Sequence, residues 1–235
     1  MPGRVGDDEQ RRDERRRADG VRERGAARAV DRVQIVDRED DLLAVRALAR
    51  ADDRPAERFG DREAELVGRL SHPNTVRLFD VGEDAGGWLF MAFELLDGQS
   101  IDKVIEREGP MDPLRAGRLA LEVLAALEEA HAMGVVHRDL KSHNVMLVRA
   151  PRGGERAGIT DFGLALHEDD GEAGGEVAGS PAYMAPEQVV GGRISPATDV
   201  YALGVVMYEM VTGKLPFVGD SAIETAQLRL DRPAP

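Results

Sequence analysis

The chain has 235 residues, enough for one two-lobed domain or two small ones. Acidic residues outnumber basic ones by 44 to 31, and the net charge of −13 argues against nucleic acid or an anionic membrane as a partner. Cysteine is absent, which excludes disulfides, thiol chemistry and zinc–cysteine sites. No apolar run approaches membrane-spanning length and the first residues are too charged for a signal peptide, so we expect a cytoplasmic protein.

Residues 1–22 consist mainly of Arg, Asp, Glu and Gly, with almost no large apolar side chains. Such a segment cannot bury enough surface to offset the entropy of ordering, so we expect a disordered charged tail. A basic functional arm is the alternative, although acidic residues are interspersed among its arginines.

The residues after this tail alternate short apolar runs with turns. The pattern predicts a helix over Pro55–Leu70 and strands over Val33–Val36, Leu42–Leu48, Thr75–Val81 and Trp88–Phe93. Acidic residues 37–41 and glycine-containing residues 82–87 are expected to form the turns within the two pairs of strands.

Helical patterns dominate the second half of the chain. They predict helices over Ser100–Arg107, Pro113–His131, Asp199–Gly213 and Ile223–Leu230, and two strands over Asn144–Val148 and Gly158–Thr160. Asp112 before Pro113 is a good helix start, because a cap followed by proline suits the first turn. The helix that follows is apolar on nearly every face, so we expect it to be buried. The polar residues 149–157 are expected to form a hairpin turn.

Three short motifs occur in order in this half. Residues 137–144 read His-Arg-Asp-Leu-Lys-Ser-His-Asn, followed by Asp161-Phe162-Gly163 and then Ala185-Pro186-Glu187. Each motif alone is weak, but the ordered set resembles the bacterial, Hanks-type protein serine/threonine kinases. A charged surface loop is the alternative, but it has no reason to reproduce three motifs in register.

The resemblance implies an α+β, two-lobed protein-kinase-like fold. A small antiparallel-sheet lobe is expected over residues 23–95 and a mainly helical lobe over residues 96–235, with ATP between them. Domains of this family continue through further helices, so the second lobe is expected to lack its final ones.

The resemblance also implies roles in phosphoryl transfer, which depends on positioning and charge neutralisation. Asp139 would accept or orient the proton of the substrate hydroxyl, and Lys141 would lie on the transferring phosphate. Asn144 and Asp161 offer hard oxygen ligands, which suit Mg²⁺ bridging the phosphates of ATP. Ser180 would contact Asp139 and Lys141 through its hydroxyl, which favours serine or threonine acceptors in a protein substrate.

The remaining site residues implied by the resemblance are contacts to the nucleotide. They are Gly25 and Val30 in the phosphate loop (residues 23–30), Ala44 above the adenine, the charge pair Arg46 and Glu63, and Glu94 and Leu96 in the hinge.

The first lobe departs from the family pattern at two places. Arg46 stands where the family has a lysine, and no lysine occurs before Lys103, so no shift of register supplies one. Glu23 and Arg28 replace two glycines of the phosphate loop, whose role is to let backbone amides approach phosphates. Because arginine is bulkier and planar, it does not simply replace lysine here. The sequence therefore supports a slow protein kinase, with a pseudokinase that binds nucleotide or a partner protein as the alternative. A small-molecule phosphotransferase is a third, weaker interpretation.

Three further expectations concern packing and regulation. Residues 164–178 contain no Ser, Thr or Tyr and therefore no residue that could be phosphorylated. Our hypothesis is that Glu168 or Glu172 permanently supplies the negative charge that a phosphate would bring to Arg138. A solvated acidic loop is the alternative. Asp199 is expected to hold the backbone of residues 137–144, to cap its own helix, or both. The resemblance implies an apolar column of Val67, Leu78, His137 and Phe162. Nothing in the sequence indicates an oligomeric state.

Overall fold

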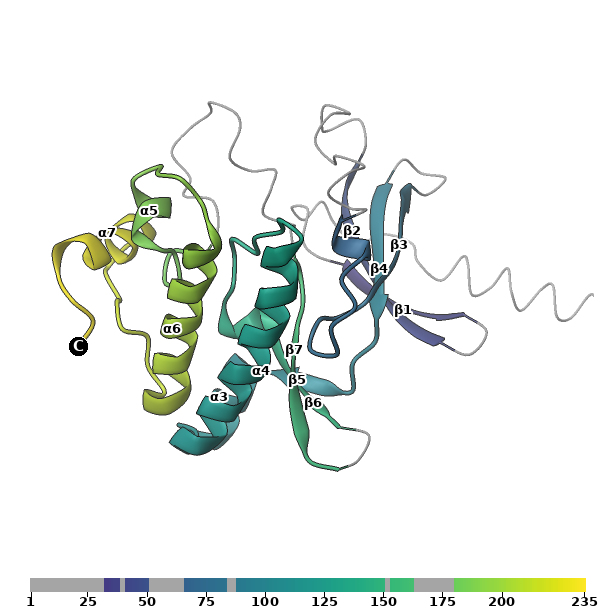
Figure 1. Cartoon of the computed structure of the whole chain (residues 1–235), viewed down its shortest axis with the longest axis horizontal. Helices are drawn as coiled ribbons and strands as arrows, with labels where there is room; N and C mark the ends of the chain where they lie inside the picture. The colour runs from purple at the N-terminus through teal and green to yellow at the C-terminus, as the bar shows by residue number, and fades with distance from the viewer. Residues whose placement is uncertain (1–31, 39–40, 51–65, 84–87, 151–152, 163–179) are drawn as a thin grey trace, which may run out of the picture. The chain divides into compact units, whose positions relative to one another are not determined.

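The computed structural model of the chain describes residues 32–38, 41–50, 66–83, 88–150, 153–162 and 180–235 (Figure 1). Several sequence-based expectations lie outside these residues and stay predictions. They concern the tail 1–22, the phosphate-loop residues Gly25 and Val30, Glu63, most of the helix expected over 55–70, and the acidic residues 164–178.

The first sheet is antiparallel, with the strand order β1–β2–β4–β3. Its strands are β1 (Arg32–Arg38), β2 (Asp41–Arg50), β3 (Leu78–Glu83) and β4 (Trp88–Glu94). The strand expected from Thr75 begins only at Leu78. Thr75 forms an isolated bridge with Ile159, and the Val76 amide donates to the Ile159 carbonyl at 2.8 Å, so these residues pair outside the sheet.

The second sheet is also antiparallel and has the order β5–β6–β7. Its strands are β5 (Gly98–Ser100), β6 (Val145–Arg149) and β7 (Glu155–Ile159). The expected hairpin turn over 149–157 was too long, because the pairing of β6 and β7 extends to Arg149 opposite Glu155. Strand β5 was not predicted. A Cβ atom on Gly98 would lie 2.3 Å from the Leu147 carbonyl oxygen, so glycine is what allows β5 to approach β6 this closely.

The helices are α3 (Ile101–Glu108), α4 (Pro113–Ala132), α5 (Pro186–Val189), α6 (Pro196–Thr212) and α7 (Ala222–Asp231), with a 3₁₀ turn η2 (Ser142–Asn144). Helix α4 begins as expected, since the Asp112 carboxylate accepts from the Leu114 amide at 3.0 Å and the Arg115 amide at 3.2 Å. Helix α6 begins at Pro196 rather than Asp199, and it ends at Thr212, just before Gly213, whose φ of 70° is left-handed. In the described part of the chain, no helix is long and apolar enough to cross a membrane.

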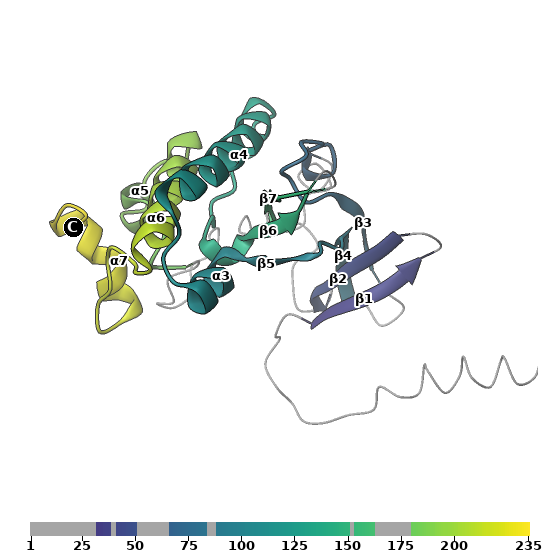
Figure 2. The same cartoon turned by 90° about the horizontal axis from the view of Figure 1, so that it is seen from below.

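Helices α4 and α6 lie side by side and supply much of the apolar core (Figures 1 and 2). The α4 residues in this core are Ala116, Leu119, Ala120, Val123, Ala126, Leu127 and Ala130, and those of α6 are Ala202, Leu203, Val206 and Met210. The expectation that α4 is buried on nearly every face was wrong, because Leu114 is 85% exposed and Leu121 is 68% exposed. Helix α4 packs against α6 and β7, whereas Leu114 and Leu121, two turns apart on one face of the helix, stay exposed to solvent.

Candidate active site

Residues 137–144, called the catalytic loop below after the role expected of Asp139, connect the region after α4 to strand β6. Asp199 on α6 is 1% exposed, and its carboxylate accepts from the backbone amides of His137 at 2.8 Å and Arg138 at 2.9 Å. His131 Nε2 lies 2.7 Å from the same carboxylate. Asp199 therefore holds the backbone of the loop, as expected. The alternative that it caps its helix was wrong, because Ser195 is the residue that precedes α6.

The backbone at Arg138 is unusual. Its φ is 68°, and in the described part of the chain only one other non-glycine residue, Asp161 with φ 62°, has a positive value. A left-handed conformation costs an ordinary residue about 1–2 kcal/mol, so surrounding contacts must hold it in place. The two strained residues flank the β6–β7 hairpin and lie in the first two of the three motifs that the sequence singled out.

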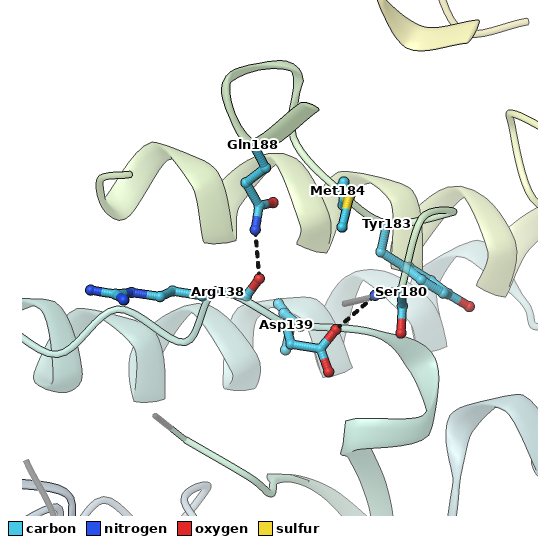
Figure 3. Close-up of a pocket in the computed structure, with 7 residues that line it drawn as sticks. Arg138, Asp139, Ser180, Tyr183, Met184 and Gln188 are labelled. Carbon is cyan, nitrogen blue, oxygen red and sulfur yellow. Dashed lines mark hydrogen bonds between the residues drawn. The ribbon is translucent and has the colours of Figure 1, made fainter. Parts of the chain in front are cut away.

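The Asp139 side chain is the centre of the site. Lys141 Nζ donates to its Oδ2 at 2.6 Å. The backbone amide of Ser180 donates to its Oδ1 at 3.2 Å, as Figure 3 shows. The Asn144 side-chain amide donates to the Asp139 carbonyl at 2.9 Å. The structure therefore brings Asp139, Lys141, Asn144 and Ser180 together. The contact that Ser180 makes with Asp139 is through its amide, and not through the hydroxyl as expected.

Asn144 and Asp161 are linked through Thr160. The Thr160 amide donates to the Asn144 carbonyl at 2.9 Å, and Thr160 Oγ1 lies 3.5 Å from Asp161 Oδ2. Because Asn144 uses its Nδ2 to bond Asp139, its amide oxygen is the atom left to act as a ligand. An amide oxygen and a carboxylate are the hard oxygen donors that Mg²⁺ prefers, so these residues fit the ion.

His137 is a packing residue in this structure. Its ring is 0% exposed, lies 4.8 Å from the Phe162 ring between centroids, and has Nε2 at 2.9 Å from the Thr160 carbonyl. Phe162 belongs to the apolar core, and Val67 packs against that core. Leu78 is buried but is not part of the same cluster, so the expected four-residue column is present only in part.

Residues 180–188, called the peptide segment below, form one wall of a pocket beside Asp139 (Figure 3). The pocket is lined by Arg138, Asp139, Leu140, Ser180, Tyr183, Met184 and Gln188. The Tyr183 hydroxyl donates to Glu209 Oε2 at 2.7 Å and lies 2.9 Å from Ser142 Oγ, and burial raises the pKa of Tyr183. Neither Tyr183 nor Gln188 was predicted as a site residue. Gln188 lies just after the third motif, and a lone Gln there carries no signal of its own.

Arg229 on α7 holds the peptide segment from the other side. It is 7% exposed, donates to the carbonyls of Met184 and Pro181, and lies 5.5 Å from the centroid of the Phe217 ring. Burial lowers the pKa of Arg229, because a charged guanidinium loses hydration there.

Replacing Arg229 by methionine is expected to reduce the free energy of unfolding by about 2–3 kcal/mol, because buried carbonyls lose a charged donor. Urea unfolding measures this loss. Arg232→Met, at an exposed position just after α7, is the matched control and should stay within about 0.5 kcal/mol of wild type. Equal stability of the two variants would contradict the anchoring role.

The nucleotide contacts expected in the first lobe are described only in part. Ala44 and Arg46 lie on β2, opposite Phe93 and Met91 of β4. Glu94 ends β4 opposite Leu43 of β2, and its amide donates to the Arg77 carbonyl at 2.9 Å, so this amide is already used within the lobe.

The two antiparallel sheets, the helical core and the catalytic loop define an α+β, two-lobed domain of the protein-kinase type. The family of the protein kinase domain matches residues 25–233, and the chain belongs to this family. The expected family and fold class are thereby confirmed.

Relatives in several bacteria are similar to the chain. It is 39% identical over 200 residues to the serine/threonine-protein kinase Pkn3 of Myxococcus xanthus, covering 83% of the chain and 36% of the relative. It is 34% identical over 203 residues to the serine/threonine-protein kinase PrkC of Bacillus subtilis, covering 86% and 30%. It is 38% identical over 179 residues to the serine/threonine-protein kinase PknA of Mycobacterium tuberculosis, covering 74% and 41%. The chain thus spans between 30% and 41% of the length of these relatives.

Proposed function

We propose that the chain is a protein serine/threonine kinase domain, which transfers the γ-phosphate of ATP to serine or threonine hydroxyls of proteins. The observation that carries the proposal is the Asp139 carboxylate held between Lys141 Nζ and the Ser180 amide. The names of the relatives support the same activity. The cytoplasm, where ATP is available, is the proposed location.

In the proposed reaction the substrate hydroxyl oxygen attacks the γ-phosphorus, and the bond from that phosphorus to the β–γ bridging oxygen breaks. Asp139 orients the hydroxyl and accepts its proton, so that the products are the phosphate ester, ADP and a protonated carboxyl group. Lys141, already 2.6 Å from Asp139, places a positive charge where the transferring phosphate would lie. The Ser180 amide fixes the second carboxylate oxygen, which limits the rotation of Asp139.

Asn144 and Asp161 are the proposed ligands of Mg²⁺. When bound, the ion neutralises negative charge on the phosphates of ATP. Asn144 is directed by its bond to the Asp139 carbonyl, and Asp161 by its left-handed backbone and its proximity to Thr160.

The proposed nucleotide contacts are those implied by the sequence: Gly25, Val30, Ala44, Arg46, Glu63, Glu94 and Leu96. Residues 23–95 and 96–235 are the proposed bounds of the two lobes. A pseudokinase is the second candidate function, and one observation favours it. Arginine at position 46 is planar and broad, whereas lysine presents a compact charge on a thin stem.

The Arg46→Lys variant separates these two functions. We expect the wild type to transfer radiolabelled phosphate from ATP to protein acceptors. The variant should do so with kcat/KM for ATP about ten-fold higher, because about 1.4 kcal/mol of transition-state stabilisation is recovered. Arg38→Lys on β1 is the matched control and should behave as wild type. Transfer by Arg46→Lys alone would support the pseudokinase, and transfer by neither would refute the proposed activity.

A further inference from the structure

Gln188 is the first residue after the third motif, and its side chain joins two segments of the site. Its Nε2 donates to the Arg138 carbonyl at 2.8 Å, and its Oε1 accepts from the Ala185 amide at 2.9 Å. Figure 3 shows the side chain reaching from the peptide segment to the backbone just before Asp139. A single side-chain amide therefore connects α5 to the catalytic loop.

Gln188 holds the Arg138 carbonyl, which belongs to the peptide unit that links Arg138 to Asp139. Because a peptide unit is planar, fixing the Arg138 carbonyl also fixes the direction of the Asp139 amide and of the Cα that follows. Asp199 holds the other side of the same residue, through the Arg138 amide at 2.9 Å. The strained Arg138, with φ 68°, is thus held on both sides, by Asp199 from α6 and by Gln188 from α5.

A second contact between the same two segments lies close by. The Ser180 amide, at the start of the peptide segment, donates to Asp139 Oδ1 at 3.2 Å. Gln188 therefore fixes the backbone before Asp139, and Ser180 fixes its carboxylate. The catalytic loop and the peptide segment both line the pocket beside Asp139, and Gln188 is one of the residues that line it.

From these contacts we infer that Gln188 is a positioning residue for Asp139. By holding the carbonyl of the left-handed Arg138, Gln188 sets the direction of the Asp139 carboxylate toward the acceptor hydroxyl. The inference deepens the proposed kinase function and rests on it. Gln188 acts through the Arg138 carbonyl and is not itself expected to contact ATP or the acceptor.

The Gln188→Met variant removes both hydrogen bonds while keeping a side chain of similar length. We expect kcat for a protein acceptor to fall about ten-fold, because small misplacements of a reacting group are costly, with KM for ATP unchanged. The midpoint of urea unfolding should stay near that of wild type, since Gln188 is only partly buried. Gln227→Met, exposed on α7, is the matched control and should leave kcat unchanged. Wild-type kcat in Gln188→Met would overturn the inference, and so would a fall matched by an equal loss of stability.

The Gln188→Glu variant supplies a readout that a purely structural role would not change. A glutamate keeps the acceptor for the Ala185 amide, but when ionised it turns an oxygen toward the Arg138 carbonyl oxygen. Protonation restores a donor, and a carboxyl group with the ordinary glutamate pKa of about 4.3 is about one-sixth protonated at about pH 5. The kcat relative to wild type should therefore rise about two-fold between about pH 8 and about pH 5, while the ratio for Gln188→Met stays flat. The charged groups around this position are Arg138 and Asp139 on the catalytic loop and Glu187 on α5, and Figure 3 shows the Arg138 side chain pointing away from Gln188. A flat ratio for both variants would count against the inference.

Hydrogen exchange separates a failure of this inference from a failure of the proposed function. The Arg138 amide, bonded to Asp199, should exchange about ten-fold faster in Gln188→Met than in wild type or Gln227→Met. If the wild type transfers no phosphate, the proposed function fails and this comparison still decides whether Gln188 holds Arg138. Equal exchange in all three proteins would refute the positioning role regardless of activity.

Discussion

The Asp139→Asn variant is expected to transfer phosphate about 10²–10⁴-fold more slowly than wild type, measured as kcat with radiolabelled ATP and a protein acceptor. An asparagine can keep the position of the side chain and still accept from the Ser180 amide. It cannot take the proton of the acceptor hydroxyl, and it loses the ionic contact with Lys141 at 2.6 Å. The loss should therefore fall on kcat, with little change in nucleotide binding.

Stability supplies the control for this variant. The Asp139 and Lys141 side chains are partly exposed to solvent, so their ion pair is worth only about 0.5 kcal/mol to folding. Urea unfolding should accordingly be nearly unchanged in Asp139→Asn. Asp231→Asn, exposed at the end of α7, removes a comparable charge and should keep full activity. Full activity in Asp139→Asn would remove the basis for the proposed mechanism.

The Asp199→Ala variant is expected to lose about 3–5 kcal/mol of unfolding free energy, because a buried charged acceptor is removed while its donors stay buried. The donors are the His137 and Arg138 amides and the His131 ring. Since small domains are stable by only about 5–15 kcal/mol, this is a large part of the total. The left-handed Arg138 also loses one of its two anchors, so activity should fall in the protein that remains folded.

Urea unfolding of Asp199→Ala, Asp199→Asn and Asp220→Asn tests this expectation. Asparagine keeps one acceptor oxygen, so its cost should lie between that of alanine and zero. Asp220 is exposed and should show no measurable effect. Equal stability of the alanine variant and wild type would mean that the three contacts contribute nothing to the folded state.

Much of the architecture was predictable because local signals and tertiary packing agreed. Asp112 with Pro113 indicated the start of α4, and the carboxylate does cap that helix. The apolar runs indicated the strands of both sheets except β5, whose three residues are too short for any pattern. Two expectations were wrong because the arrangement of segments in the fold decided the outcome. Thr75 pairs with Ile159 instead of entering β3, and the two exposed leucines of α4 lie on a face that stays in solvent while α4 packs against α6 and β7.

The order and spacing of the motifs by themselves determined the family, the fold class and which polar residues to examine, because phosphoryl transfer requires particular side chains at set distances along the chain. Only the tertiary structure decided how those side chains are held. The Ser180 amide, Asp199 and Gln188 reach the catalytic loop from segments distant in sequence, and such contacts leave no local pattern. Hydrogen bonds that fix a strained backbone depend on where folded segments meet, and these segments are brought together by a shared apolar core that includes α4, α6 and Leu140, with Tyr183 packed against it.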